Sequence, residues 1–245
     1  MKKVLLPWSN LLSLALVGVI LWMEPAQAAV TSGPEFDTLV AIYDNAGGPN
    51  WYNELENKQV WKVGDACTWF GLTCNAAGDH IDVIDIYNNN LVGTLPDLSG
   101  LTQISNIHIE GNQIAQFPPG VSALGELRSF VMSNNGMQGS LPILSALQKL
   151  EHFDIASNQL SQSLPDLTGL GALKYFDVSY NSFSGPLPSG LGGLQNLEVF
   201  GASSNHFDSL SDFSGAQLRI PAKPGRHSGA CRAGDVKRFG YFRCD

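Results

Sequence analysis

The sequence predicts an α/β solenoid, in which successive turns of the chain stack along one axis and share a parallel inner β-sheet. Three observations support this: an asparagine at a near-constant period, apolar residues at fixed offsets around it, and cysteines at both ends of the periodic region. The intervals are 23 residues and finally 24, at Asn89, Asn112, Asn135, Asn158, Asn181 and Asn205. Such periods are typical of repeat proteins, whose units bury a core only by stacking.

The apolar residues around each asparagine specify the kind of solenoid. They precede and follow it at the same offsets in each copy, as Ile84, Ile86 and Leu91 do around Asn89. An L-x-L-x-x-N-x-L core with a period of roughly 20–29 residues predicts a right-handed leucine-rich-repeat superhelix. A chain of this kind is expected to be a binding surface and not an enzyme.

Residues 1–28 have the pattern of an export signal. Lys2 and Lys3 precede an apolar run from Leu11 to Met23, and Ala26-Gln27-Ala28 supplies a signal-peptidase site. The alternative is an uncleaved membrane anchor, but the run is short for a bilayer span of roughly 20 residues. The mature chain is therefore expected to be secreted or periplasmic, with no stable membrane span.

Residues 29–80 are predicted to form an N-terminal cap over the apolar end of the first repeat. Residues 36–43 have the apolar stripe of an amphipathic helix. Trp51 and Trp61 add aromatic bulk, which we interpret as cap core. The alternative for both tryptophans is a sugar-stacking role, since the ring suits either site.

The four cysteines are expected to form disulfides, because an even number in an exported chain favours pairing. Cys67 and Cys74 precede the repeats, whereas Cys231 and Cys244 follow them. Three pairings are formally open. We expect the two local ones, since the two pairs lie at opposite ends of a rod. Neither pair has the histidines or repeated C-x-x-C of a zinc site.

Residues 81–214 are predicted to form six repeats. Each begins with a short strand, such as Ile107–Ile109, and successive strands pair in parallel. The asparagine follows the strand, where its side chain can bond backbone groups that the bend leaves unpaired. We therefore expect the asparagines to hold the bends and not to bind a ligand.

Several repeats continue with L-x-G-x-L-P, and the cap has a matching motif. Cys67–Cys74 fits the C-x-W-x-G-V-x-C end of a cap, with Leu72 in place of valine. In these features the chain resembles plant-type extracellular leucine-rich-repeat proteins, the class of polygalacturonase-inhibiting proteins and receptor-kinase ectodomains. The resemblance implies a second, outer strand at L-x-G-x-L-P. Ala115–Pro118 and Gln162 depart from this pattern and put the outer strand in doubt locally.

Residues 215–245 are predicted to be a disulfide-bearing C-terminal cap. Residues 29–215 hold 5 basic and 19 acidic residues, whereas residues 216–245 hold 7 basic and 2 acidic residues. The acidic body argues against nucleic acid as a partner, since phosphate binding needs clustered lysine and arginine. The chain has no N-x-S/T sequon. Together with the two-lysine leader, this absence leads us to interpret the chain as a bacterial member of the class.

Residues flanking the buried positions of the inner strands are expected to face the concave side of the solenoid. They form a polar, acid-rich strip on which Tyr87 and Tyr175 are expected to be exposed. Asp154 and Asp177 are expected to be neighbours on adjacent strands, where like charges destabilise. We propose these partner-binding residues: Tyr87, His108, Glu110, His152, Asp154, Tyr175 and Asp177. The alternative is a solvated face without a partner.

The hypothesis that follows is an exported module that binds a protein partner on its acidic concave face. The partner would be a basic secreted enzyme, which the module could inhibit, or a host surface protein. The resemblance also implies that partners contact this strip. The alternative is an adhesin of the cell envelope or host surface that binds glycan through exposed tyrosines. No cofactor or metal is expected, because two carboxylates are too few ligands for Ca²⁺, and an open strip lacks the pocket of an enzyme.

Overall fold

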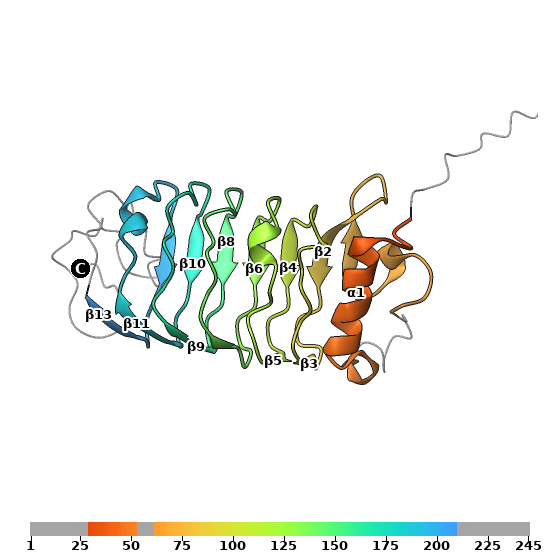
Figure 1. Ribbon diagram of the computed structural model, residues 1–245, viewed down its shortest axis with the longest axis horizontal. Coiled ribbons are helices and arrows are strands. Elements are labelled where there is room, and N and C mark those ends of the chain that lie inside the picture. Colours follow the sequence, from red (N-terminus) through yellow and green to blue (C-terminus); the bar gives the residue numbers. More distant parts are fainter. Residues whose placement is uncertain (1–28, 53–60, 210–245) are drawn as a thin grey trace, which may run out of the picture.

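The computed structural model describes residues 29–52 and 61–209, which form a solenoid of stacked turns (Figure 1). A helix covers one end of the stack, and each turn passes through a strand of one long sheet (Figure 1). The predicted solenoid with a parallel inner sheet is therefore confirmed. The export signal, the C-terminal cap and the Cys231–Cys244 pair lie outside the described residues.

The inner sheet has seven strands within the described part of the chain, in the order β1-β2-β4-β6-β8-β10-β12. β1 (Leu72–Cys74) belongs to the cap and is antiparallel to the first repeat strand. The remaining strands pair in parallel with equivalent residues opposite one another. They are β2 (Ile81–Asp85), β4 (Asn106–His108), β6 (Ser129–Val131), β8 (His152–Asp154), β10 (Tyr175–Asp177) and β12 (Val199–Gly201).

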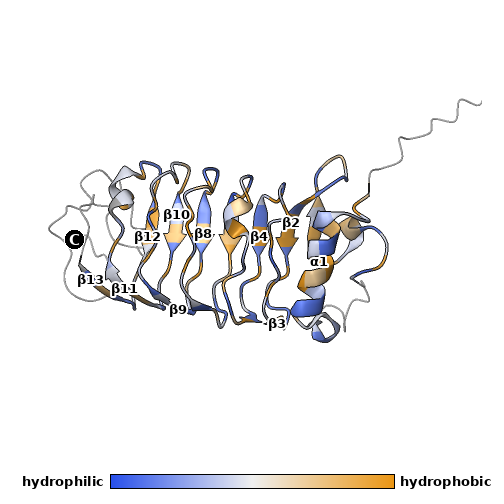
Figure 2. Ribbon diagram, viewed as in Figure 1, coloured by the Kyte–Doolittle hydropathy of each residue, from blue (hydrophilic) through white to orange (hydrophobic). Residues whose placement is uncertain are grey.

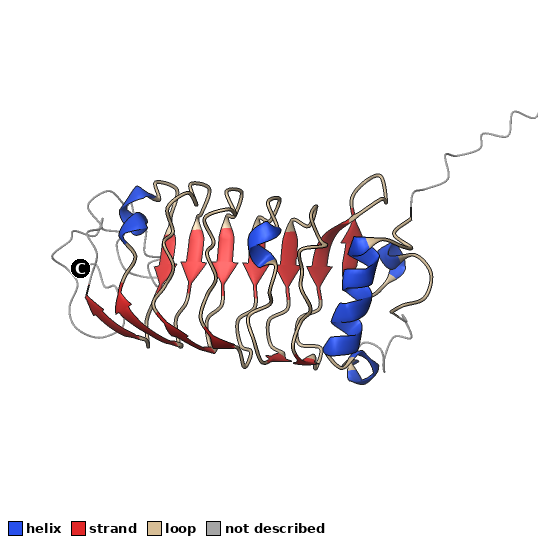
Figure 3. Ribbon diagram, in the orientation of Figure 1, coloured by secondary structure: helices blue, strands red, loops and turns tan. Residues whose placement is uncertain are grey.

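The outer strands form a second row along one long edge of the solenoid (Figure 3). Gln162, which departs from the repeat motif, still lies in an outer strand and takes a φ of 71° where glycine stands in other turns. Around Ala115–Pro118 the strand is short, and one bridge from Gln116 to Gln138 continues it. The outer strands are β3 (Val92–Gly93), β5 (Gln113–Ile114), β7 (Gln138–Gly139), β9 (Gln159–Gln162), β11 (Ser182–Pro186) and β13 (His206–Ser209).

The core lies between the two rows of strands. The inner strands contain both hydrophobic and hydrophilic residues (Figure 2), and the central side chain of most of them is fully buried. The rings of Phe130, Phe153 and Phe176 stack with centroids 5.6 and 5.3 Å apart. Each buried ring of this size contributes roughly 1.5–3 kcal/mol. Short 3₁₀-helices, η3 (Val121–Ala123) and η4 (Ser189–Gly193), lie in two of the return loops.

The N-terminal cap contains α1 (Pro34–Asn45), η1 (Gly48–Asn50) and η2 (Ala66–Thr68). Trp51 and Trp61 are 1% and 2% exposed and meet edge to face with centroids 4.9 Å apart. Their ring N–H groups donate to the backbone oxygens of Ala46 and Phe70. The two tryptophans therefore form cap core, and the sugar-stacking alternative is wrong because neither ring is accessible.

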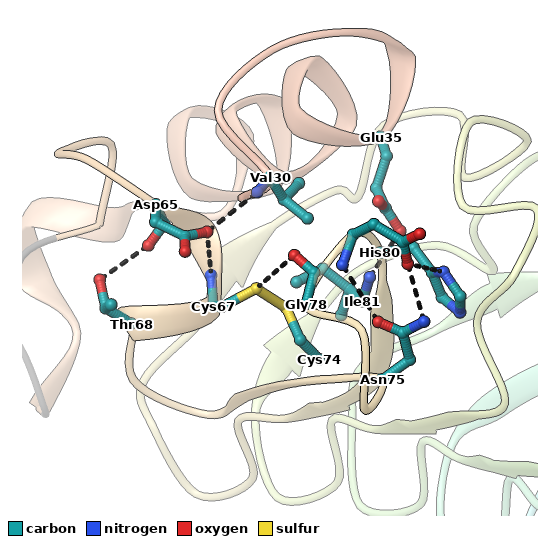
Figure 4. The surroundings of a disulfide bond; sticks show 11 residues. Val30, Glu35, Asp65, Cys67, Thr68, Cys74, Asn75, Gly78, His80 and Ile81 are labelled. Atoms are coloured by element: carbon teal, nitrogen blue, oxygen red, sulfur yellow. Dashed lines mark hydrogen bonds and ion pairs between the residues drawn. A yellow bond between two sulfur atoms is a disulfide. The ribbon is translucent and has the colours of Figure 1, made fainter. Parts of the chain in front are cut away.

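The cap is closed by the Cys67–Cys74 disulfide, as the expected local pairing requires (Figure 4). Asp65 organises the segment before it: one carboxylate oxygen accepts hydrogen bonds from the backbone N–H groups of Val30 and Cys67, both at 3.0 Å. The disulfide thus joins η2 to β1, and β1 in turn pairs with the first repeat strand.

The periodic asparagines connect each turn to the one before it. The Oδ1 atom of Asn158 accepts from the backbone N–H of Met137 at 3.0 Å, and its Nδ2 donates to the carbonyl oxygens of Met132 and Ile155 at 3.1 and 3.0 Å. Four other asparagines make the same bonds, both to the previous turn and within their own turn: Asn112, Asn135, Asn181 and Asn205. The expected structural role is confirmed for these five asparagines.

Replacing Asn158 with alanine should lower the free energy of unfolding by about 1–3 kcal/mol, because it leaves the buried backbone N–H of Met137 without its partner. The carbonyl oxygens of Met132 and Ile155 keep the hydrogen bonds that Asn135 and Asn181 donate to them. Urea unfolding followed by circular dichroism measures this change. Gln148→Ala, at an exposed position of a return loop, is the matched control and should stay within about 0.5 kcal/mol of the wild type. Equal effects of the two substitutions would contradict the role of Asn158.

Candidate protein-binding face

The concave strip expected from the sequence corresponds to the outward side of the inner sheet. In β4, β6, β8 and β10 the central residue is buried and its two neighbours are partly exposed. We call the outward side of β2, β4, β6, β8, β10 and β12, with the residue two positions beyond each strand, the sheet face. Because the strands pair in register, equivalent residues of successive turns line up in columns across it.

Two aromatic rings stack at the centre of the sheet face. His152 in β8 lies opposite Tyr175 in β10, and their rings are parallel within 2° with centroids 4.3 Å apart. Tyr175 is half-buried and not exposed as the sequence suggested. The stack holds two large side chains in fixed positions, so little rotational freedom remains to be lost when a partner binds.

Asp154 and Asp177 lie directly opposite one another in the next column, as expected. Each carboxylate accepts a hydrogen bond from the backbone N–H two residues on: Asp154 from Ala156 at 3.0 Å and Asp177 from Ser179 at 2.8 Å. The Tyr175 hydroxyl donates to Asp177 at 3.3 Å. The two carboxylates are thus held in place next to each other, where their charges repel.

Burial and charge alter the acidity of this group of residues. Burial raises the pKa of Asp154, and the neighbouring Asp177 carboxylate raises it further. Burial, together with the carboxylates of Asp177 and Asp154, raises the pKa of Tyr175 to about 12. Burial lowers the pKa of His152. At neutral pH the histidine is therefore uncharged and does not neutralise the carboxylates.

The cations of the repeats are paired elsewhere. Arg128 and Lys174 both contact Glu151, and Lys149 contacts Glu126. These residues precede the strands or lie in the return loops. Among the ion pairs of residues 29–52 and 61–209, none includes a carboxylate of the sheet face. Its negative charge is therefore uncompensated within the described part of the chain.

The remaining candidates form a second group toward the N-terminal end of the face. His108 contacts the Ser129 hydroxyl through Nε2 at 2.9 Å. Tyr87 is 53% exposed, as expected. One carboxylate oxygen of Asp85 and one of Glu110 are buried without a hydrogen-bond partner among the described residues. The seven candidates thus divide into His152, Asp154, Tyr175 and Asp177 on one side of β6 and Tyr87, His108 and Glu110 on the other.

One exposed aromatic residue next to the sheet face is not among the residues predicted from the sequence. Tyr180 is 53% exposed and has a φ of 54°, a left-handed backbone conformation that is unusual for a bulky side chain. It directly precedes the periodic asparagine Asn181. In other turns this position is occupied by Asn88, Gly111 and Asn134, also with positive φ. Other repeats have glycine, asparagine or serine at this position, so the sequence itself marks the tyrosine as unusual.

Comparison with known proteins supports the fold. The Leucine Rich Repeat family model matches residues 172–194, which is one repeat length. The ectodomain of the receptor kinase SOBIR1 from Arabidopsis thaliana has a TM-score of 0.58 and 20% identity, over 78% of this chain and 96% of that chain. The chain has the leucine-rich-repeat fold.

Two other structures with this leucine-rich-repeat fold are complexes. The BIR3–SERK2 complex from Arabidopsis thaliana matches with a TM-score of 0.55 and 20% identity, over 71% of this chain and 95% of that chain. The GASSHO1/SCHENGEN3 ectodomain of the same plant, in complex with CASPARIAN STRIP INTEGRITY FACTOR 2, matches with a TM-score of 0.53 and 22% identity, over 73% of this chain and 24% of that chain.

The described residues form neither a membrane-spanning helix nor a metal site. Within residues 29–52 and 61–209, no helix is both long and apolar enough to cross a bilayer. In the same part of the chain, no three histidine, cysteine or carboxylate side chains gather as a metal site would require.

Replacing Asp154 with asparagine should raise the free energy of unfolding near pH 7. A carboxyl group with a raised folded-state pKa binds its proton more tightly when folded, so its ionisation lowers stability as the pH rises through that pKa. Asparagine keeps an oxygen for the Ala156 N–H but carries no charge. Urea unfolding should show an advantage of the variant near pH 7 that shrinks below about pH 4. An equal effect at both pH values would contradict the assignment.

Proposed function

We propose that the chain is an exported module that captures a basic protein partner on its sheet face. The observation that carries the proposal is the separation of charge in the repeats. Arg128, Lys149 and Lys174 are already paired with glutamates, whereas Asp154 and Asp177 stand opposite one another without a cation. A lysine or arginine of a partner placed between them relieves the repulsion and gains charge-assisted hydrogen bonds.

The central group of the face supplies both parts of such an interface. The carboxylates steer a positively charged partner toward the face, and the His152–Tyr175 stack supplies a fixed aromatic surface beside them. Tyr87, His108 and Glu110 lie on the far side of β6 and extend the contact area. An interface that spans both groups reaches across five strands spaced about 4.8 Å apart.

The comparisons support a protein partner in general terms, since two neighbours of this fold are complexes with another protein or factor. The predicted export signal and the Cys67–Cys74 disulfide support action outside the cytoplasm. We propose that the partner is a basic secreted enzyme, which the module inhibits by covering it, or a host surface protein. Inhibition is also what the resemblance to polygalacturonase-inhibiting proteins suggests.

Reversing the two central charges tests the proposal. Immobilised wild type should capture a basic protein from culture medium or cell-wall extract, and Asp154→Lys/Asp177→Lys should bind the same protein at least about tenfold more weakly. Mass spectrometry identifies the captured protein, and biolayer interferometry measures its affinity. The association rate should also fall as the salt concentration rises.

The matched control is Asp37→Lys/Asp208→Lys, which changes the net charge equally at two exposed positions away from the sheet face. This control should bind like the wild type. Thermal unfolding of the wild type, the control and Asp154→Lys/Asp177→Lys, the central variant, shows whether the central variant is folded. Asp154→Asn/Asp177→Asn removes the same two charges without reversing them and serves as a milder variant. Unchanged capture by a folded central variant, or an equal loss in the control, would reject the sheet face as the binding site.

A further inference from the structure

We propose that the outer edge of the solenoid is a second binding surface, and that it takes a neutral, extended polysaccharide. The outer edge consists of the outward side chains of β3, β5, β7, β9 and β11. These strands lie in one row along the molecule (Figure 3). It is separate from the sheet face, and it does not depend on the function proposed for that face.

The outer edge carries no charge over five consecutive turns. Aspartate, glutamate, lysine, arginine and histidine are all absent from residues 91–96, 113–119, 137–143, 159–165 and 182–188. The whole chain has a formal net charge of −8, and the same turns place carboxylates on the sheet face and in the return loops. The absence of charge is therefore a property of this edge and not of the repeats in general.

The acidic residues that directly follow two of these segments are hydrogen-bonded within the return loops. Asp97 and Asp166 come after the prolines that end two of these segments. Their carboxylates accept hydrogen bonds from the backbone N–H groups of Ser99 and Thr168, at 2.9 and 3.0 Å. Both side chains thus organise the return loops instead of facing the outer edge.

Amide and hydroxyl groups replace the missing charges. Gln113, Gln138 and Gln159 are exposed, and each belongs to a different outer strand. The Gln138 amide donates to the Gln159 carbonyl oxygen at 3.3 Å, and the two residues are register partners. A side-chain amide has two donor hydrogens and two acceptor lone pairs, so each keeps capacity for a ligand. Ser161 and Ser182 continue the row, again as register partners.

The spacing of this row suits a sugar polymer. Neighbouring parallel strands are about 4.8 Å apart, and one sugar of an extended β-1,4-linked chain advances by a similar length. A polysaccharide lying along the edge therefore meets a new polar side chain with each sugar. Hydroxyl groups of sugars both donate and accept, as the amides do. Each contact is weak, and the affinity comes from many of them along one chain.

Other classes of partner fit the outer edge less well. Its large exposed apolar side chains, Val92 and Ile143, stand on separate turns, so they form no continuous apolar patch such as the core of a protein interface. An anionic polymer such as pectate or nucleic acid requires lysine or arginine, and the five segments have neither. A neutral polymer needs no counter-charge.

Affinity electrophoresis tests the proposal with the mature full-length chain. Native gels contain hydroxyethylcellulose or xyloglucan as neutral probes, polygalacturonate as an anionic probe, or no polymer. The wild type should be retarded by a neutral polymer and not by polygalacturonate. The test variant Gln116→Glu/Gln159→Glu changes Gln159 of β9 and Gln116, an exposed residue whose backbone forms a bridge to Gln138 of β7. The variant keeps the shape of both side chains but removes their N–H donors and adds charge. It should bind about tenfold more weakly, the loss expected for two hydrogen bonds.

The control Gln148→Glu/Gln195→Glu makes the same chemical change at exposed positions in the return loops before β8 and β12. It should be retarded like the wild type, and so should Asp154→Lys/Asp177→Lys, which separates this proposal from the one for the sheet face. Soluble trisaccharides should compete poorly, since they reach few turns. The proposal is overturned if neutral polymers do not retard the wild type, if polygalacturonate alone retards it, or if both glutamate variants lose binding equally.

Discussion

The hydrogen bonds of the buried asparagines are the constraint on which the rest of the structure depends. Asn158 accepts from the backbone N–H of Met137 in the previous turn and donates to the carbonyl oxygens of Met132 in that turn and Ile155 in its own turn. Asn112 and Asn181 make the equivalent bonds. The strand ends at this point, and the backbone groups of the bend would otherwise be buried without partners. The bonds therefore set how far each turn is displaced from the next.

That fixed displacement gives both surfaces their chemistry. Because equivalent residues face each other across neighbouring strands, a single residue type repeated at one position becomes a column. Asp154 and Asp177 form such a pair on the sheet face, and Gln138 and Gln159 form one on the outer edge. The first repetition accumulates negative charge, and the second accumulates neutral hydrogen-bonding groups. One fold thus presents two chemically different sides of the same turns.

Much of this architecture could be predicted from the sequence, because the period fixes which residues are buried. The parallel inner sheet, the role of the asparagines, the buried tryptophans of the cap and the Cys67–Cys74 pair follow from spacing and polarity. Contacts between turns could not be predicted in the same way. The half-burial of Tyr175 results from its stacking on His152, and Gln162 keeps its outer strand by adopting a backbone conformation that glycine usually takes.

Hydrogen exchange tests the central role of the asparagines most directly. The backbone amides of Leu91, Ile114, Met137, Leu160 and Phe183 donate to asparagine side chains. Measured by NMR under native conditions, these amides should exchange as slowly as the amides of the neighbouring inner strands, with protection lost only when the turns separate. Exchange at the rate of unprotected amides, while the inner strands stay protected, would contradict the account.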